Sequence, residues 1–166
     1  MTPNRFRPHV MVLPEDRANS EVANGFLLDP SLAPRSVQVL AEAGGWTKVL
    51  DRFETDHIVE MQKYTQRHMV LLFDFDGQEN RLADARNRIP PHLAERVFVI
   101  GSLTEPEELR HATGLSPEKI GLELAKDCRE DTALVWGHDL LKHNAGELVR
   151  MRERVRPILF PAPLTA

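Results

Sequence analysis

Acidic residues in two clusters have the types and spacing best suited to chemistry in this sequence. Glu15 and Asp16 directly follow one short apolar segment, and a second cluster directly follows the most hydrophobic segment of the chain. That second cluster is Asp74-Phe75-Asp76, in which the two carboxylates share one face as long as the chain stays extended.

Carboxylates placed this close repel each other as anions, and the repulsion must be relieved by a raised pKa, a basic partner or a bound cation. Hard oxygen ligands of this kind suit Mg²⁺, or Mn²⁺ in its place. We therefore predict that Glu15, Asp74 and Asp76 are catalytic and metal-ligating residues, with Asp16 as an accessory residue. The alternative is that these acidic residues only cap the helices that follow the strands.

The apolar segments that precede and separate these clusters predict a parallel sheet. Short runs typical of buried strands occupy residues 9–13, 36–40, 68–73 and 96–100. The segments between them favour helices, which occupy residues 19–28, 46–63 and 79–88. This alternation predicts an α/β fold with three layers, in which helices cover both faces of a mainly parallel sheet of four to five strands.

The last third of the chain is predicted to be largely helical. Ser116 followed by Pro117 is typical of a helix start, and we expect helices over residues 116–128 and 139–154. Residues 156–160 fit either a last strand or a segment that docks on the core. We predict one domain, residues 1–166, made of an α/β core at 8–102, a helical extension at 103–160 and a tail at 161–166.

The predicted fold brings the two acidic clusters to one edge of the sheet. In a parallel sheet, ligands bind beyond the carboxyl ends of the strands, because there the chain leaves the sheet and loops converge. Glu15 follows the first predicted strand and Asp74 follows the third, so both belong to that edge. We therefore expect them to form one acidic crevice.

This arrangement resembles the Toprim domain, the catalytic module shared by topoisomerases, bacterial primases, ribosomal-RNA maturases and the overcoming-lysogenization-defect nucleases. In that family a glutamate follows the first strand, and an Asp-x-Asp motif follows the third strand of a small parallel sheet. Here Glu15 follows Val-Met-Val-Leu-Pro, and Asp74-Phe75-Asp76 follows Val-Leu-Leu-Phe. The resemblance covers residues 8–102, and Asp16 stands where the family usually has a glycine.

The resemblance implies a Toprim-like nuclease or nuclease-related factor that acts on DNA or RNA. By that resemblance Asp74 and Asp76 would hold Mg²⁺, and Glu15 would act as general acid or base or as a further ligand in phosphoryl transfer. A non-catalytic interaction or regulatory module that keeps the fold is the alternative, and it is favoured by Asp16 in the glycine position and by the acidic balance of the chain.

One motif also resembles that of haloacid-dehalogenase phosphatases. Their first motif is an apolar strand that ends in Asp-x-Asp-Gly, and residues 71–77 match it letter for letter. That family places the motif on its first strand, whereas two predicted strands precede it here. A phosphatase is therefore the second alternative, and it also implies Mg²⁺.

A further polar cluster lies towards the C-terminus. His138 and Lys142 are four residues apart, as are His143 and Glu147, so a helix would place each pair on one face. We expect His138 and His143 as accessory residues that shuttle a proton or contact a phosphate, with structural pairing on a helix surface as the alternative. Arginines follow at alternate positions, and we expect most of them to be solvated or paired: Arg150, Arg152, Arg154 and Arg156.

Composition restricts the class of protein and its partners. The chain has 166 residues, of which 42% are hydrophobic and 28% are charged, as in ordinary globular domains. A net charge of −4 does not favour non-specific adhesion to nucleic acid or anionic lipid, so any nucleic-acid contact must be local. Cys128 is the only cysteine, which favours a reducing, cytoplasmic compartment. No apolar stretch is long enough to cross a membrane, and a homodimer is left open.

Overall fold

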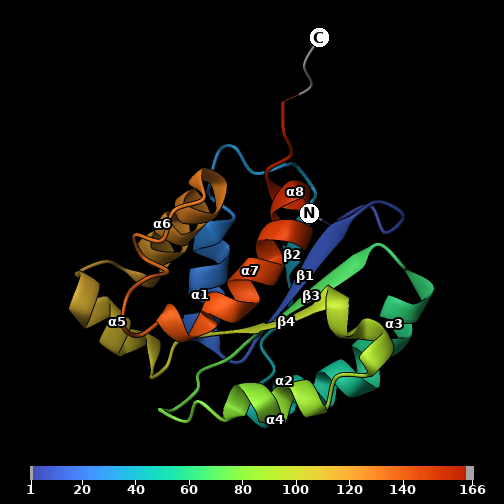
Figure 1. The fold of residues 1–166 in the computed structure, drawn as a ribbon, viewed down its shortest axis with the longest axis horizontal. Helices are drawn as coiled ribbons and strands as arrows, with labels where there is room; N and C mark the ends of the chain where they lie inside the picture. Colours follow the sequence, from blue (N-terminus) through green and yellow to red (C-terminus); the bar gives the residue numbers. More distant parts are fainter. Residues whose placement is uncertain (1, 164–166) are drawn as a thin grey trace.

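The centre of the fold is a parallel β-sheet with helices on both faces (Figure 1). The structure, a computed structural model, describes residues 2–163. The strands within that range are β1 (His9–Pro14), β2 (Val37–Val39), β3 (Arg67–Leu72) and β4 (Val97–Ile100). They lie in the order β2-β1-β3-β4, and every neighbouring pair is parallel. The predicted α/β class is confirmed.

The direction in which successive strands are added to the sheet reverses between β1 and β3. The chain leaves β1 for β2 on one side of it, then crosses to β3 and continues to β4 on the other side. The register pairs Pro14 with Leu72, so β1 and β3 end at the same level. In sheets of this kind the loops after two such strands diverge and leave a crevice, where ligands bind.

Helices form the connections and the C-terminal third. The helices before β4 are α1 (Arg17–Phe26), α2 (Trp46–Arg52), α3 (Ile58–Lys63) and α4 (Arg81–Asn87). The helices after β4 are α5 (Pro106–Thr113), α6 (Pro117–Glu130), α7 (Ala145–Arg154) and α8 (Arg156–Leu159). Shorter helical stretches are the π-helical η1 (Phe53–His57) and the 3-10 turns η2 (Pro91–Arg96) and η3 (Lys142–Asn144).

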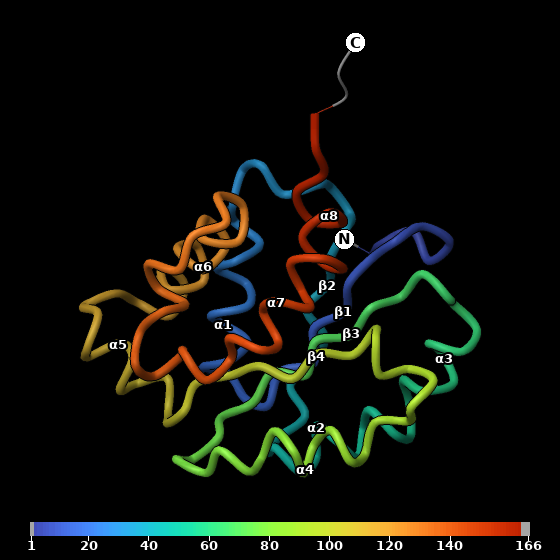
Figure 2. The backbone as a smooth tube through the Cα atoms, viewed as in Figure 1, coloured from blue at the N-terminus to red at the C-terminus, as the bar shows by residue number. Residues whose placement is uncertain are grey.

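Two apolar clusters hold the sheet between its helices. On one face the strands pack against α2, α3 and α4, and the rings of Phe53, Phe73 and Phe75 are buried there. On the other face Phe98 of β4 belongs to a cluster that includes Leu159 of α8. Figure 2 shows these two groups of helices on opposite sides of the strands, with α1, α7 and α8 on the second side. The result is a three-layer arrangement.

Helix α6 packs on α1, farther from the sheet, in direct backbone contact. A Cβ atom on Gly25 of α1 would overlap the carbonyl of Glu118, and a Cβ atom on Gly121 of α6 would overlap the carbonyl of Val22. Only glycine permits this approach at both positions. The contact also explains why the pair Asn24-Gly25, a turn signal in the sequence, lies inside a helix.

Three sequence predictions need correction or refinement along the chain. The predicted helix 46–63 is helical throughout, but the π-helical η1 separates α2 from α3. Residues 156–159 form the short helix α8, so the interpretation as a last strand was wrong and the docking alternative holds.

The predicted helix 139–154 begins only at Ala145, after the 3-10 turn η3. Residues 139–141 lie in turns, and the carbonyl of Leu140 accepts a hydrogen bond from the N–H of Leu103 (2.8 Å). This bond attaches residues 139–141 to the chain just after β4. The Leu140 carbonyl therefore accepts a long-range hydrogen bond from Leu103.

No helix within residues 2–163 is both long enough and apolar enough to cross a membrane. Of the predicted tail, residues 161–163 are not part of a helix or strand, and residues 164–166 lie outside the described range.

Candidate metal centre

Glu15 lies at the carboxyl end of β1, where three hydrogen bonds fix it. Its N–H donates to the carbonyl of Leu72 (2.8 Å), which continues the pairing of β1 with β3 by one residue. Its carbonyl accepts from the N–H of Gly44 (2.7 Å), in the loop that leads to α2. Its carboxylate Oε2 accepts from the N–H of Asp74 (2.8 Å). The side chain of Glu15 therefore joins the end of β1 to the end of β3.

Asp74 lies just beyond β3, and only 6% of its surface is exposed. The N–H of Phe75 donates to the carbonyl of Ser102 (2.9 Å), so the pairing of β3 with β4 continues past the strand ends. The continued register places Asp74 opposite Ser102, with both side chains on one face. Asp74 Oδ1 and Ser102 Oγ are buried, and neither has a hydrogen-bond partner among residues 2–163. Buried oxygens without partners are costly and call for an explanation.

Asp16 is the N-cap residue of α1. Its Oδ1 accepts from the backbone N–H of Asn19 and from the side-chain amide of Asn19, both at 3.0 Å. The capping role that was the alternative for the acidic residues therefore applies to Asp16. Asn19 is itself buried, so the cap also fixes the orientation of the Asp16 carboxylate.

Three carboxylates converge at this point. Glu15, Asp16 and Asp74 each place one oxygen within 4.8 Å of the other two. Burial, together with the charges of Glu15 and Asp16, raises the pKa of Asp74 to about 8. Burial also raises the pKa of Glu15, although the hydrogen bond from Asp74 N–H opposes the shift. Anions this close together need either a shared proton or a bound cation.

Asp76 does not join these three carboxylates. Its backbone is left-handed (φ 49°), so the extended conformation ends before it and Asp76 does not share a strand face with Asp74. Its carboxylate is 54% exposed and forms an ion pair with Arg81 (3.0 Å). Arg81 also donates to the Asp74 carbonyl (2.8 Å) and lies 4.5 Å above the ring of Trp46. The shared face predicted for Asp74 and Asp76 is not formed, and the role of Asp76 as a ligand stays a prediction.

The two predicted accessory histidines belong to other parts of the structure. The helix expected to carry them begins after both, so the predicted four-residue pairing is not formed. His138 Nδ1 accepts from the N–H of Leu140 (3.1 Å). His143 packs on the ring of Phe75 with 4.7 Å between centroids, and burial lowers its pKa, which favours a neutral imidazole. The accessory roles of His138 and His143 stay predictions.

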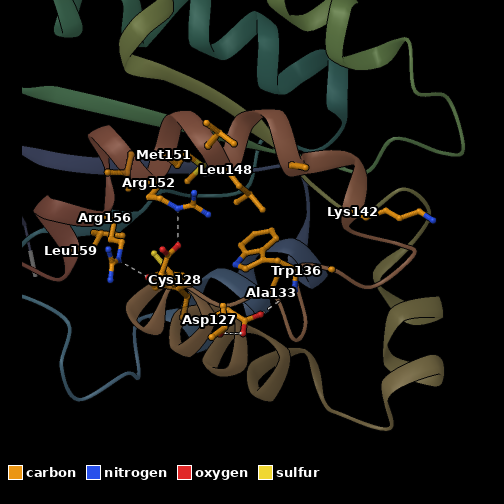
Figure 3. Close-up of a pocket in the computed structure, with 17 residues that line it drawn as sticks. Asp127, Cys128, Ala133, Trp136, Lys142, Leu148, Met151, Arg152, Arg156 and Leu159 are labelled. Atoms are coloured by element: carbon orange, nitrogen blue, oxygen red, sulfur yellow. Dashed lines mark hydrogen bonds and ion pairs between the residues drawn. The ribbon is translucent and has the colours of Figure 1, made fainter.

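A separate cavity of about 270 Å³ lies between α6 and α7 (Figure 3). Its lining is mainly apolar and includes Trp136, Leu148 and Met151. Its charged groups already have partners: Arg152 pairs with Asp131 (2.7 Å), and Arg156 donates to the Cys128 carbonyl (2.9 Å). The other two alternating arginines are also paired, Arg150 with Glu147 and Arg154 with Glu95. The paired state predicted for most of these arginines is confirmed.

Three residues near the acidic cluster were not predicted as ligands or catalytic residues from the sequence, although Asn19 was considered as a residue that shapes a loop over the site. Ser102 follows the fourth strand as Asp74 follows the third, so strand-end position was a signal available for it. Asn19 stands three residues after the N-cap Asp16, a spacing that predicts a capping contact. The position of Arg81 depends on how α4 packs, and local sequence carries no signal for it.

Comparisons of this chain with family models, with curated proteins and with solved structures return no match. The functional argument therefore rests on the fold and on the geometry of the three converging carboxylates.

Proposed function

We propose that this chain is a Mg²⁺-dependent phosphoryl-transfer protein of the Toprim-like nuclease type, acting on DNA or RNA. The observation that carries the proposal is the convergence of Glu15, Asp16 and Asp74 at the carboxyl ends of β1 and β3. Asp74 Oδ1 is buried there without a partner among the described residues. A divalent cation at this point would supply the missing partner and relieve the repulsion.

The donor set fits Mg²⁺ or Mn²⁺. The three converging groups are all carboxylates, and hard oxygen donors suit these ions, whereas softer metals prefer imidazole or thiolate ligands. Glu15 and Asp74, with Asp16 beside them, would hold the ion. When bound, it would neutralise charge on the non-bridging oxygens of a phosphate.

The residues of the chain itself would supply position and proton transfer. Glu15, oriented by the N–H of Asp74, is the proposed general acid or base, or a further ligand. Arg81, stacked on Trp46, fixes the backbone of Asp74 through the carbonyl of that residue. The buried Ser102 hydroxyl, on the same face as Asp74, has no hydrogen-bond partner among residues 2–163 and could bond to a ligand oxygen.

The geometry supports the Toprim-like interpretation better than the phosphatase alternative. Both resemblances use Asp74 and Asp76 together, so the ion pair of Asp76 with Arg81 does not distinguish between them. Glu15, which the phosphatase motif does not include, is the residue that bonds to the backbone of Asp74.

Cleavage of labelled single-stranded DNA and RNA with Mg²⁺ or Mn²⁺ tests the proposal. We expect metal-dependent hydrolysis that EDTA abolishes and that Asp74→Asn reduces by about 100-fold or more. Asp84→Asn is the matched control, because Asp84 is an exposed carboxylate on α4, and it should cleave like the wild type. Wild-type protein that cleaves neither substrate under any of these conditions would favour the interaction module instead.

The cytoplasmic compartment and the homodimer stay predictions. Their direct measurements are cell fractionation and the mass of the particle in solution.

A further inference from the structure

The end of the sheet opposite the acidic cluster of Glu15, Asp16 and Asp74 combines positive charge with an exposed aromatic ring. In Figure 1 the N-terminal segment and α3 lie at this end, whereas the loop after β3 lies at the other. Arg5 and Arg7 flank Phe6, and Lys63 and Arg67 come from the end of α3 and the start of β3. Phe6 is 83% exposed, a larger fraction than that of any other exposed large hydrophobic residue in the described part of the chain.

Three cations surround the ring of Tyr64. The guanidinium groups of Arg5 and Arg67 lie 5.4 Å and 5.3 Å from the ring centroid, and the ammonium group of Lys63 lies 5.3 Å from it. Arg5 Nη1 donates to the Tyr64 hydroxyl (3.2 Å), and this bond is the main reason why the pKa of the phenol is lowered. Within residues 2–163, one of these cations forms an ion pair with an acidic residue: Arg67 pairs with Glu60 at 3.9 Å. The cluster therefore carries excess positive charge.

His9 adds no compensating charge to this cluster. Arg67 Nε donates to His9 Nε2 (3.1 Å), so that ring nitrogen must be an acceptor. The proton then lies on His9 Nδ1, which faces the carbonyl of Arg7 at 2.7 Å. Burial lowers the pKa of His9, which agrees with a neutral ring. Arg67, itself 6% exposed, thus keeps its charge next to a neutral partner.

A turn fixes the segment that presents Phe6. The N–H of Phe6 donates to Asn4 Oδ1 (3.0 Å), and the N–H of Arg7 donates to the carbonyl of Asn4 (3.2 Å). The Phe6 ring meets the Tyr64 ring edge to face, with 5.8 Å between centroids. The rest of the Phe6 ring is open to solvent, so a flat group can stack on it without rearrangement of the chain.

We propose that this end of the sheet is a binding site for single-stranded nucleic acid. Phe6 stacks on a base, while Arg5, Arg7 and Lys63 contact the backbone phosphates. Stacking on an aromatic ring beside cations is how proteins hold single strands, because every base has an aromatic face. An anionic membrane fits less well, since membrane surfaces take an amphipathic apolar face and Phe6 is a single ring. The site is separate from the acidic cluster and needs no metal.

Fluorescence anisotropy of a labelled oligothymidylate, in EDTA and at low salt, tests this site with the full chain. We expect binding that weakens with salt, and about tenfold weaker binding for Phe6→Ala, the loss typical of one stacked base. Arg5→Gln combined with Lys63→Gln should weaken binding further and lower the salt dependence, because two phosphate contacts are lost. Asp84→Asn, which removes an exposed carboxylate on α4, should bind like the wild type.

Matched controls come from exposed residues elsewhere on the surface. Leu134→Ala removes another exposed apolar side chain, 78% exposed, and Arg110→Gln combined with Lys126→Gln removes two cations from α5 and α6. These variants should keep wild-type affinity. The proposal is overturned by absence of binding, by equal losses in the controls, by binding that Phe6→Ala leaves intact, or by preference for anionic lipid vesicles over the oligonucleotide. None of these results bears on cleavage at Asp74, so the two proposals fail separately.

Discussion

Two buried carboxylates of this protein have opposite surroundings. Glu147 of α7 is 4% exposed, and its carboxylate accepts hydrogen bonds from Arg86, from Arg150 (3.1 Å) and from the N–H of Val99 (3.0 Å). Asp74 is buried to a similar extent, but its Oδ1 has no partner among the described residues and two further carboxylates lie nearby. One carboxylate is fully compensated within the chain, and the other is not.

The difference distinguishes a carboxylate that holds the fold together from one whose environment is typical of a binding or catalytic site. A buried charge that the protein satisfies with its own donors holds elements together, here α7, α4 and the edge strand β4. A buried charge kept among like charges lowers stability, and such groups cluster at binding and catalytic sites. The environment of Asp74 therefore points to an external partner, while that of Glu147 does not.

The largest expected effect is on Glu147. Glu147→Ala leaves two guanidinium groups and the N–H of Val99 without their common acceptor, so we expect a loss of about 3 to 5 kcal/mol in the free energy of unfolding. Urea denaturation of the variant and the wild type measures this loss. A loss below about 1 kcal/mol would mean that the arginines find other partners, and the comparison with Asp74 would lose its basis.

Asp127 is a second buried carboxylate that the chain satisfies with its own hydrogen-bond donors. Its contribution to the free energy of unfolding should depend on pH. Although burial by itself would raise its pKa, the Thr132 hydroxyl and the N–H groups of residues 134–136 donate to its carboxylate and lower it. Its folded pKa is below its unfolded pKa, so its stabilisation is present above about pH 4 and is lost as pH falls through the folded pKa.

We therefore expect Asp127→Asn to lower the free energy of unfolding by about 2 kcal/mol near neutral pH. The difference from the wild type should shrink as the solution is acidified. Denaturation curves at several pH values measure it, and a difference that stays constant down to about pH 3 would contradict the assignment.

For Asp74, the free energy of unfolding should change with pH in the opposite direction. Its folded pKa of about 8 lies above its unfolded value, so the folded state holds a proton that the unfolded state has already lost. The free energy of unfolding of the metal-free wild type should therefore fall between about pH 4 and about pH 8 relative to Asp74→Asn. We expect the variant to be the more stable of the two at the upper end of this range. If the variant is less stable than the wild type in EDTA, the chain itself compensates the charge of Asp74, as it does for Glu147.

The smallest effect is expected at Asp76. The Asp76 side chain is 54% exposed, the buried Arg81 keeps its bond to the Asp74 carbonyl, and Asn tolerates a left-handed backbone as well as Asp does. Asp76→Asn should change the free energy of unfolding by about 0.5 kcal/mol or less, as urea denaturation would record. A large loss would show that Arg81 depends on this partner for its charge.

The strands were predictable from the sequence because they are short, continuous apolar runs. The predicted strand 9–13 and the observed β1 differ by a single residue, and the other three agree to within one or two residues at each end. Helix boundaries were less predictable where long-range contacts decide them. The start of α7 depends on the bond between Leu103 and Leu140, and Gly25 lies in a helix because α6 packs against it.

The acidic cluster was predictable in part. Strand-end position correctly identifies the edge at which Glu15 and Asp74 meet, because parallel strands end on the same side of a sheet. Sequence spacing did not reveal that the chain turns at Asp76, because the left-handed conformation there follows from the loop. The partner of Asp76, Arg81, comes from the folded position of α4.

Calorimetric titration of Mn²⁺ and Mg²⁺ into the metal-free protein at about pH 8 tests the metal centre most directly, because no substrate needs to be guessed. The proposed centre predicts binding of one ion by the wild type, loss of binding in Asp74→Asn and Glu15→Gln, and retention in Asp76→Asn and in the control Asp84→Asn. Bound metal should also raise the Tm by about 3 to 5 °C at ten times its Kd. Absence of binding at millimolar metal, or binding that Asp74→Asn leaves unchanged, would contradict it.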